Sequence, residues 1–269
     1  MNAPDSKAHL VIANVSKVFD SDGRKMVALQ GIDLEIPRGQ FVCLLGPSGC
    51  GKSTLLNAIA GFAPPTSGRI VADGVPVAGP GPERGMVFQE YALFPWMTVE
   101  QNVGFGLEIK GMARAQIARR VAGLLKLLSL EDFAKRYPKD LSGGMRQRVA
   151  IARVLALDSP ILLMDEPFGA LDALTRRNLQ DELLRLWAEL KKTVIFVTHS
   201  IEEAIYLADR IVVMTYRPGT IKRDMLVELP RLRDPAAPEF NALKRELGLM
   251  VMEEQQRHHA AEIRSAVVD

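Results

Sequence analysis

The chain has 269 residues, a hydrophobic fraction of 48%, a charged fraction of 25% and a formal net charge of +2. This composition excludes a disordered or fibrous chain, and a charge so close to zero gives no overall field that would attract nucleic acid or anionic lipid. No stretch approaches about 18 uncharged apolar residues, so no membrane-spanning helix is expected. Residues 1–14 lack the pattern of a secretory leader, and Cys43 and Cys50 favour a reducing compartment over a disulfide.

The first part of the chain is rich in β-type patterns. Residues 9–19 and 27–36 predict two strands joined by a turn, and the wholly apolar segment 41–45 predicts a strand buried on both faces. A glycine-rich turn and a helical segment to about Ala60 follow. Residues 69–74 and 86–89 predict two further short strands.

The pattern becomes helical from about Thr98 to Leu157, and strands and helices alternate again after Pro160. Strands are predicted at 161–165, 193–199 and 210–215, with helices at 174–191 and 200–208. We therefore expect an α/β fold with a mainly parallel sheet. Its core would span 1–89 and 158–218, a helical subdomain would span 90–157, and a tail at 219–269 would hold a hairpin (220–229) and a polar helix (236–262).

The segment GPSGCGKST matches the pattern of a phosphate-binding loop, G-x-x-x-x-G-K-[ST]. Glycines let backbone N–H groups wrap a phosphate at a helix start, the lysine reaches the β- and γ-phosphates, and the serine hydroxyl binds Mg²⁺. A plain glycine-rich turn before a helix is the alternative, but the position between a buried strand and a helix favours a nucleotide site. The candidate residues are Gly46, Pro47, Ser48, Gly49, Cys50, Gly51, Lys52, Ser53 and Thr54.

The apolar segment ILLMDE (161–166) ends in two carboxylates. Asp165 is a candidate Mg²⁺ ligand, and Glu166 is a candidate for polarising the attacking water. By itself, an acidic turn at a strand end would be unremarkable. Its combination with the phosphate-binding loop favours a catalytic site.

The segment LSGGMRQ predicts a second phosphate-binding helix start. Ser142 can cap a helix, and Gly143 and Gly144 leave N–H groups exposed at its first turn. An ordinary serine cap in a flexible loop is the alternative. Met145, Val149, Ala152 and Ala156 predict the buried stripe of this helix.

These motifs, in this order, resemble the ATP-binding cassette (ABC) ATPases, the nucleotide-binding subunits of membrane transporters. The resemblance runs from about residue 9 to 230. LSGGMRQ is similar to the family signature, with Met145 where glutamine is commoner, and Gly169 replaces the commoner serine of the D-loop. The resemblance implies a fold with a P-loop NTPase core, an N-terminal antiparallel β region and an inserted helical subdomain.

The resemblance also implies roles for residues that their own chemistry would not single out. Gln89 matches the glutamine that senses Mg²⁺ and water, and His199 matches the switch histidine near the γ-phosphate. Asp172 lies in the D-loop at the dimer interface. Phe19 matches the aromatic residue that stacks on adenine, with a core phenylalanine as the alternative.

The implied mechanism uses ATP and Mg²⁺ in a homodimer. Two copies would sandwich two nucleotides head to tail, with each phosphate-binding loop facing the other copy's Ser142–Gly144 segment. The implied partners are a separate membrane permease and, indirectly, a solute-binding protein, with no nucleic acid. The implied location is peripheral, on the cytoplasmic face of the inner membrane.

The segments 75–108 and 229–240 resemble the nitrate, sulfonate and taurine import ATPases, so a small anion is the expected solute. Phe94-Pro95-Trp96 would begin the surface that receives the permease, with local packing as the alternative role of this element. A lipid or lipoprotein exporter and a DNA- or ribosome-acting ABC ATPase are the alternatives.

Finally, the position of Cys50 beside a helix start and Lys52 predicts a lowered thiol pKa and a reactive thiol that Mg-ATP protects.

Overall fold

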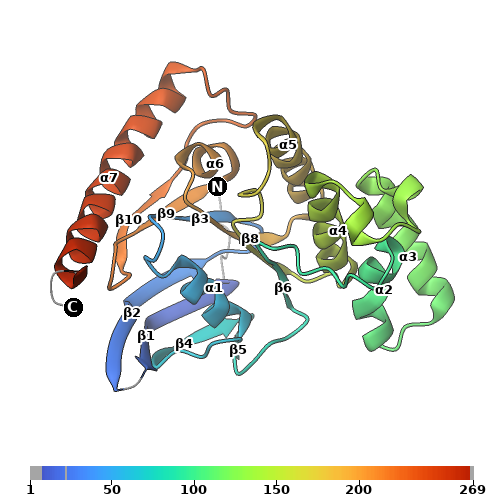
Figure 1. Cartoon of the computed structure of the whole chain (residues 1–269), viewed down its shortest axis with the longest axis horizontal. Coiled ribbons are helices and arrows are strands. Elements are labelled where there is room, and N and C mark those ends of the chain that lie inside the picture. The colour runs from blue at the N-terminus through green and yellow to red at the C-terminus, as the bar shows by residue number, and fades with distance from the viewer. Residues whose placement is uncertain (1–7, 22, 267–269) are drawn as a thin grey trace, which may run out of the picture. The chain divides into compact units, whose positions relative to one another are not determined.

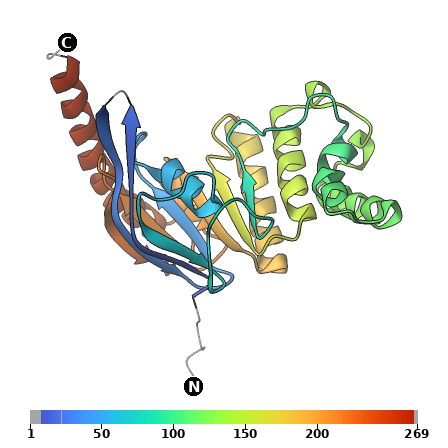
Figure 2. The ribbon, with the colours of Figure 1, turned by 90° about the horizontal axis from the view of Figure 1, so that it is seen from below.

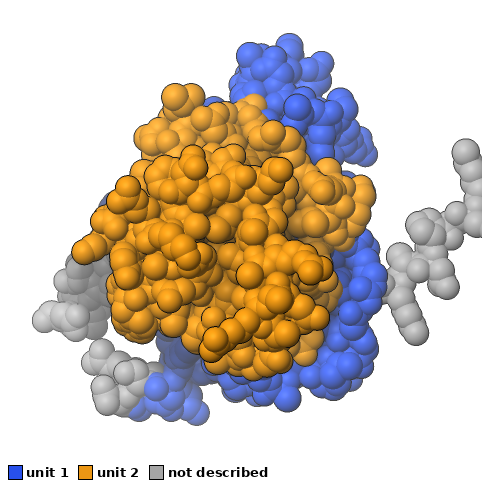
Figure 3. Space-filling model, turned by 90° about the vertical axis from the view of Figure 1, so that its right-hand side faces the viewer, with its two compact units in different colours: residues 1–80, 193–269 blue, residues 81–192 orange. Residues whose placement is uncertain are grey.

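The computed structural model describes residues 8–21 and 23–266, which fall into two compact units. The first unit lies within residues 1–80 and 193–269, and the second unit spans residues 81–192 (Figure 3). In the described ranges, no helix combines the length and the apolar character needed to cross a bilayer.

The first unit contains an antiparallel sheet near the N-terminus. Its strands are β1 (Leu10–Ser21), β2 (Arg24–Ile36), β4 (Ser67–Ala72) and the two-residue β5 (Val75–Pro76), in the order β2-β1-β4-β5. β1 pairs antiparallel with both β2 and β4, and the two long strands lie side by side in Figure 2. The predicted antiparallel β region is confirmed. Both long strands come closer to the connecting turn than predicted, because β1 continues to Ser21 and β2 begins at Arg24.

The first unit also holds a mainly parallel sheet portion. Its strands are β3 (Phe41–Leu45), β8 (Thr193–Thr198), β9 (Arg210–Met214) and β10 (Ile221–Leu226). β3 runs parallel to β8 and β9, and every residue of β3 and β8 is buried. Such burial on both faces is the reason that these strands read as continuous apolar runs.

The predicted hairpin within 220–229 is wrong. β10 instead pairs antiparallel with β9, so the hairpin spans both strands and its turn lies at 215–220. The Thr215 side chain closes this turn, because its hydroxyl accepts from the Thr220 amide at 2.9 Å and donates to the Pro218 carbonyl at 2.9 Å. The pairing joins a predicted strand of the core to the segment that the sequence assigned to a separate tail.

Three helices complete the first unit: α1 (Lys52–Ala60), α6 (Ile201–Leu207) and α7 (Pro238–Ala266). The long C-terminal helix α7 packs against α6 (Figure 1). The face of α7 that contributes to the core carries Phe240, Leu247 and Val251, which are at most 5% exposed. The tail helix is therefore an integral part of the first unit.

The second unit contains a pair of parallel strands, β6 (Arg84–Val87) and β7 (Ile161–Asp165). Its helices are α2 (Val99–Ile109), α3 (Arg114–Leu127), α4 (Gly143–Ala156) and α5 (Ala173–Leu190), with 3₁₀ turns η1 (Glu131–Phe133) and η2 (Pro138–Asp140). α2 packs against both α3 and α4. The unit therefore includes β6, β7 and α5 as well as the helices of the predicted subdomain, whose own limits at 90 and 157 stay a prediction.

Candidate nucleotide-binding site

The glycine-rich turn between β3 and α1 forms a tight loop whose shape requires glycine. Gly49 and Gly51 have φ angles of 75° and 97°, a region that side chains disfavour. A Cβ atom on Gly51 would lie 2.7 Å from Leu29 Cδ2 and 3.0 Å from the Ala28 carbonyl oxygen. The loop is therefore pressed against β2 and fixed in its path.

The start of α1 is suited to bind an anion. Its N-cap is Gly51, no side chain caps it, and no acidic residue lies in its first turn. Uncapped N–H groups and the positive end of the helix dipole together favour a phosphate at this position. Lys52 begins the helix and is only 4% exposed, with Nζ donating to the carbonyl oxygens of Gly46 and Pro47 at 2.8 Å each. A buried ammonium group is thus held inside the loop by two neutral oxygens that a phosphate could replace.

The predicted lowering of the Cys50 thiol pKa is wrong. Cys50 is fully buried, and burial raises the pKa of its thiol, an effect that Lys52 only partly offsets. A helix start and a nearby lysine lower a thiol pKa when the thiol keeps contact with water, but here desolvation of the thiolate is the larger effect. Cys43 on β3 is also buried, and its thiol pKa is raised well above the ordinary range for the same reason.

His199 and Phe19 are the other predicted site residues in the first unit. His199 is exposed and follows directly after β8. The preceding Thr198 is buried and donates to the Glu203 carboxylate at 2.6 Å, so the backbone beside His199 is anchored to α6.

Phe19 is 40% exposed on β1, with the Lys17 ammonium 5.3 Å from its ring centre. An exposed ring is free to stack, and its pairing with adenine stays a prediction.

The two carboxylates lie where β7 ends. Asp165 is the last residue of β7, Glu166 follows it, and both side chains are half-buried. Glu166 has a φ angle of 44°, which is uncommon for a residue with a side chain. Such strained backbone is characteristic of functional sites, where it aims a side chain that a relaxed strand end would direct elsewhere.

Gln89 lies in a loop after β6, whereas the sequence predicted it as the last residue of the strand. The strand ends at Val87, and the loop continues through Tyr91 and Ala92, whose φ angles are 58° and 48°. Arg153 of α4 holds this loop by donating to the Ala92 and Tyr91 carbonyl oxygens at 2.6 and 3.2 Å. Burial lowers the pKa of Arg153. Sequence reasoning missed Arg153, because a lone arginine in a helix carries no signal of its partner.

Ser142 caps α4, as the sequence predicted, with its hydroxyl accepting from the Met145 amide at 3.3 Å. Val149, Ala152 and Ala156 are buried in the predicted stripe, whereas Met145 is only half-buried. The cap itself does not separate an ordinary helix start from a phosphate site, so the phosphate role stays a prediction.

The signature glycines pack closely against the segment that follows β7. A Cβ atom on Gly144 would lie 2.6 Å from Thr175 Cγ2, and one on Gly143 would lie 3.2 Å from Leu171 Cδ2. Asp172 caps α5 by accepting from the Thr175 amide at 3.0 Å, and hydrogen bonds to Thr175 lower the pKa of this carboxyl. The structure thus brings the predicted signature and D-loop residues together on neighbouring helix starts.

A buried asparagine that sequence reasoning missed organises the segment after Gln89. Asn102 of α2 is fully buried and accepts from the Phe94 amide at 2.9 Å, while its amide group donates to the carbonyl oxygens of Phe94, Met97 and Thr98. Phe94 packs against Phe105, with ring centres 4.6 Å apart, and Trp96 is 70% exposed. The turn therefore presents a large aromatic side chain from a rigid base.

The predicted residues fall into two groups. The first unit holds Phe19, the loop 46–54 and His199, and the second unit holds Gln89, Ser142, Gly143, Gly144, Asp165, Glu166 and Asp172. No cluster of three or more His, Cys, Asp or Glu side chains among the described residues is arranged to hold a metal ion. The predicted Mg²⁺ ligands Ser53, Gln89 and Asp165 offer a hydroxyl, an amide and a carboxylate oxygen, and such oxygen donors suit Mg²⁺.

A buried parallel strand, a glycine-rich turn and a helix begun by a buried lysine define a P-loop nucleotide-binding fold. The sequence matches the family described as "ABC transporter" over residues 29–169. It is 52% identical over 234 residues to an uncharacterized ABC transporter ATP-binding protein of Methanocaldococcus jannaschii, covering 87% of this chain and 88% of that protein.

Two further relatives carry specific names. The nitrate import ATP-binding protein NrtD of Synechocystis is 47% identical, covering 88% of this chain and 90% of that protein. The taurine import ATP-binding protein TauB of Jannaschia is 51% identical, covering 80% and 81%. A solved dimeric, post-hydrolysis structure of the ATP-binding cassette MJ0796 with ADP and phosphate has a TM-score of 0.73 at 35% identity, covering 82% of this chain and all of that one. The chain belongs to the ABC transporter family, in which it is an ATPase cassette.

Proposed function

We propose that this chain is the ATP-hydrolysing subunit of an importer for a small anion such as nitrate, taurine or an aliphatic sulfonate. The main support for the ATPase assignment is the burial of Lys52 in a glycine-rich loop, at a helix start that no side chain caps. The names of relatives at 45–51% identity, which import nitrate, taurine and aliphatic sulfonates, support the solute class. Relatives for these three solutes resemble the chain about equally well, so the proposal extends to the class and not to one anion.

In this proposal the loop 46–54 binds the ATP phosphates through its amides, Lys52 and the helix dipole. The ammonium of Lys52 would exchange the two backbone carbonyls for phosphate oxygens, a stronger pairing because both partners are charged. Ser53, Gln89 and Asp165 would hold Mg²⁺, which neutralises charge on the phosphates when it is bound. Phe19 would stack on the adenine ring.

Hydrolysis would depend on residues that follow the buried strands. Glu166 would orient and polarise the attacking water, and its φ angle of 44° supports a backbone set for this task. His199 would contact the γ-phosphate region from the end of β8, with Thr198 and Glu203 fixing the backbone beside it. Each of these groups acts only when water attacks, so substituting them should impair turnover more than binding.

We further propose a head-to-tail homodimer in which the Ser142–Gly144 segment of one copy faces the nucleotide of the other. The exposed Ser142 at the start of α4 supports this role, as does the dimeric state of the solved MJ0796 cassette. ATP would favour the closed dimer and hydrolysis the open one, because the two states bind nucleotide with different affinity. Asp172 would lie at the same interface.

The proposed membrane partner is a separate permease that docks on the second unit. A groove of about 780 Å³ is lined by residues of α2, α3 and η1. Its lining combines apolar residues, among them Ile117, Val121 and Leu125, with exposed charged residues of both signs such as Glu108 and Arg114. Such a groove suits a short amphipathic helix of the permease, with the exposed Trp96 on the same unit as a further anchor. The subunit would then lie on the cytoplasmic face of the inner membrane.

Two substitutions and one uptake assay test the proposal. Lys52→Ala should abolish or strongly weaken ATP binding, whereas Glu166→Gln should bind ATP and accumulate as a dimer without turnover. Cells that lack the subunit should lose uptake of nitrate, taurine or an alkanesulfonate and regain it with the unmodified gene but not with Lys52→Ala. Normal hydrolysis by Glu166→Gln would contradict its role. Unchanged uptake of all three anions would contradict the solute class.

A further inference from the structure

The turn between β9 and β10 lies directly against the phosphate-binding loop. Arg217 in this turn is exposed, and its Nε donates to the carbonyl oxygen of Gly49 at 3.2 Å. A Cβ atom on Gly219 would lie only 2.2 Å from the Cys50 carbonyl oxygen, so the turn also contacts the next peptide of the loop. Two consecutive peptides of the loop are thus backed by one turn from the far end of the chain.

The turn is itself held in place by β2. The Gly219 amide donates to the Ala28 carbonyl at 2.9 Å, and the Gln30 amide donates to the Gly219 carbonyl at 3.0 Å. Gly51 of the loop packs against the same Ala28 carbonyl. The loop and the turn therefore share one rigid support, and Arg217 is fixed relative to the peptide that it contacts.

The contact from Arg217 has a definite effect on the loop. In a trans peptide the C=O and the following N–H point in opposite directions, because the bond is planar. Holding the Gly49 carbonyl on the Arg217 side therefore holds the Cys50 N–H on the other side. A cationic donor on the carbonyl also polarises the peptide, which makes this N–H a better donor to an anion.

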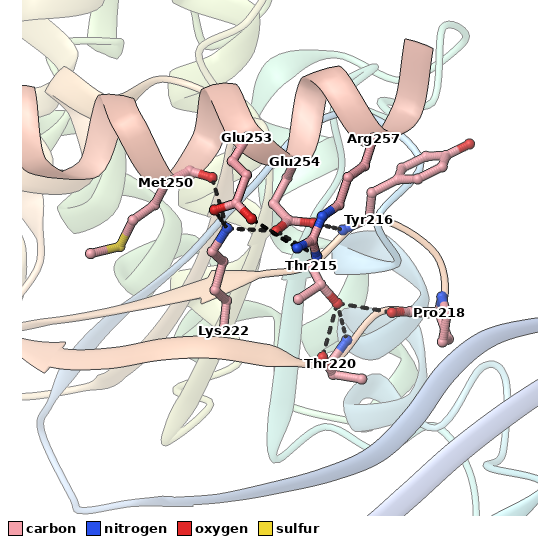
Figure 4. Close-up of polar contacts among 9 residues, drawn as sticks. All are labelled: Thr215, Tyr216, Pro218, Thr220, Lys222, Met250, Glu253, Glu254 and Arg257. Carbon is pink, nitrogen blue, oxygen red and sulfur yellow. Dashed lines mark hydrogen bonds and ion pairs between the residues drawn. The ribbon is translucent and has the colours of Figure 1, made fainter. Parts of the chain in front are cut away.

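The C-terminal helix fixes the other side of the turn (Figure 4). Glu254 of α7 is fully buried and accepts from the Tyr216 amide at 2.9 Å. Its second oxygen accepts from Lys222 of β10 at 2.6 Å and lies 3.2 Å from Arg257. The rings of Tyr216 and His258 lie 4.4 Å apart. This buried carboxylate fixes the turn to α7, because removing it would leave the Tyr216 amide without its acceptor.

We propose that Arg217 is a positioning residue for ATP, which sets the Cys50 amide toward the phosphates, and that Glu254 of α7 acts on the site through the same turn. The inference rests on the proposed assignment of the loop 46–54 to the ATP phosphates. According to this inference, the C-terminal helix α7 influences nucleotide binding, although it lies about 200 residues from the loop in sequence. Movement of α7 would then change the affinity of the site for ATP.

The test compares the affinity for a fluorescent ATP analogue with turnover in the full-length protein. Arg217→Ala should raise the dissociation constant about five- to tenfold, the scale of one ordinary hydrogen bond, because Arg217 acts on the phosphates only through the peptide between Gly49 and Cys50. It should leave kcat at saturating ATP within about twofold. Arg217→Lys, which keeps a cationic donor, should recover most of the affinity. Arg223→Ala is the matched control, because it removes the same charge from an exposed position on β10.

Melting temperature without nucleotide separates positioning from folding. Arg217→Ala and Arg223→Ala should melt alike, since both side chains are exposed. An Arg217→Ala protein that binds ATP as tightly as Arg223→Ala would overturn the inference. Lys52→Ala serves as the reference for the site itself: if it alone loses binding, the proposed site stands and the role of Arg217 fails. If Lys52→Ala binds ATP normally, the proposed site has failed first.

A double-mutant cycle tests the α7 part. Glu254→Asp keeps the charge but withdraws the carboxylate by one methylene, so it should fold and weaken ATP binding about threefold or more. If Glu254 acts through Arg217, the effect of Glu254→Asp should nearly vanish in the Arg217→Ala background. Effects that simply multiply would overturn the link between α7 and the loop. Lys244→Gln, which breaks the pairing of α7 with Glu202 of α6, is the control for weakened helix docking.

Discussion

Gly144 offers a direct test of the packing between α4 and α5. A Cβ atom there would lie 2.6 Å from Thr175 Cγ2, well inside the ordinary carbon–carbon contact of about 3.5–4.0 Å. Thr175 cannot turn away easily, because β-branched residues are stiff at χ1 and its backbone amide and hydroxyl bond to Asp172. The helices would have to separate for alanine to fit.

The expected magnitude follows from two opposing effects. Overpacking a well-filled contact costs about 1–3 kcal/mol, and replacing glycine by alanine in a helix returns up to about 1 kcal/mol. We therefore expect Gly144→Ala to lower the free energy of unfolding by about 1–2 kcal/mol. Gly123 of α3 is the matched control, since nothing lies within 4 Å of the Cβ atom that it would gain. Gly123→Ala should instead stabilise the protein by about 0.5–1 kcal/mol.

Urea unfolding followed by tryptophan fluorescence is the assay. Trp96 and Trp187 are the only two tryptophans of the chain, and both lie in the second unit together with the substitutions. Thr175→Ser removes the obstructing methyl group and keeps the hydroxyl, so in the double variant it should recover about 1 kcal/mol relative to the sum of the single effects. Equal stabilities of Gly144→Ala and Gly123→Ala would refute the close contact, as would a lack of rescue by Thr175→Ser.

Three further outcomes are expected. Burial lowers the pKa of His9 from its ordinary value of 6.5, an effect that Asp73 partly opposes, so below about pH 6.5 the unfolded chain binds more protons than the folded one. The free energy of unfolding should therefore fall as the pH is lowered from 7 to 5. His9→Gln should reduce this pH dependence, as measured by urea unfolding at each pH. An unchanged pH dependence in His9→Gln would exclude His9 as its source. Buried Cys50 should react with iodoacetamide at pH 7.5 at least about tenfold more slowly than in the urea-unfolded chain, as followed by mass spectrometry, and equal rates would show an accessible thiol. Asn102→Leu should cost about 2–4 kcal/mol in urea unfolding, because the Phe94 amide and neighbouring carbonyls lose their buried partner, and a loss below about 0.5 kcal/mol would contradict that network.

Much of the fold could be predicted because its signals are local. The glycines at 49 and 51 mark positive φ angles, the apolar run 41–45 marks a strand buried on both faces, and Ser142 marks a helix start. Each depends on the backbone chemistry of a few adjacent residues, which is the same in any surroundings. The order of these motifs was also sufficient to indicate the family.

The errors arose where the outcome depends on distant parts of the chain. The hairpin assigned to 220–229 was wrong because the partner of β10 is β9, and strand pairing is decided by the sheet and not by one segment. The expected reactive thiol at Cys50 was wrong because neighbours in sequence suggested an exposed helix start, whereas packing removed the thiol from water. Gln89 lies beyond the end of its strand for a related reason. β6 is defined by its pairing with β7, and that pairing ends at Val87 opposite Met164.

The sequence by itself determined which short segment has the pattern of a phosphate-binding loop, because glycine spacing, a lysine and a hydroxyl are properties of a few adjacent residues. Only the tertiary structure decided what supports that segment. Arg217 contacts Gly49 across 168 positions of the chain, and Glu254 reaches Tyr216 across 38. No local pattern encodes such contacts, because they form only when the sheet and α7 bring these distant segments side by side. The burial of Glu254 also depends on that packing, and burial strengthens its charge and its hydrogen bonds.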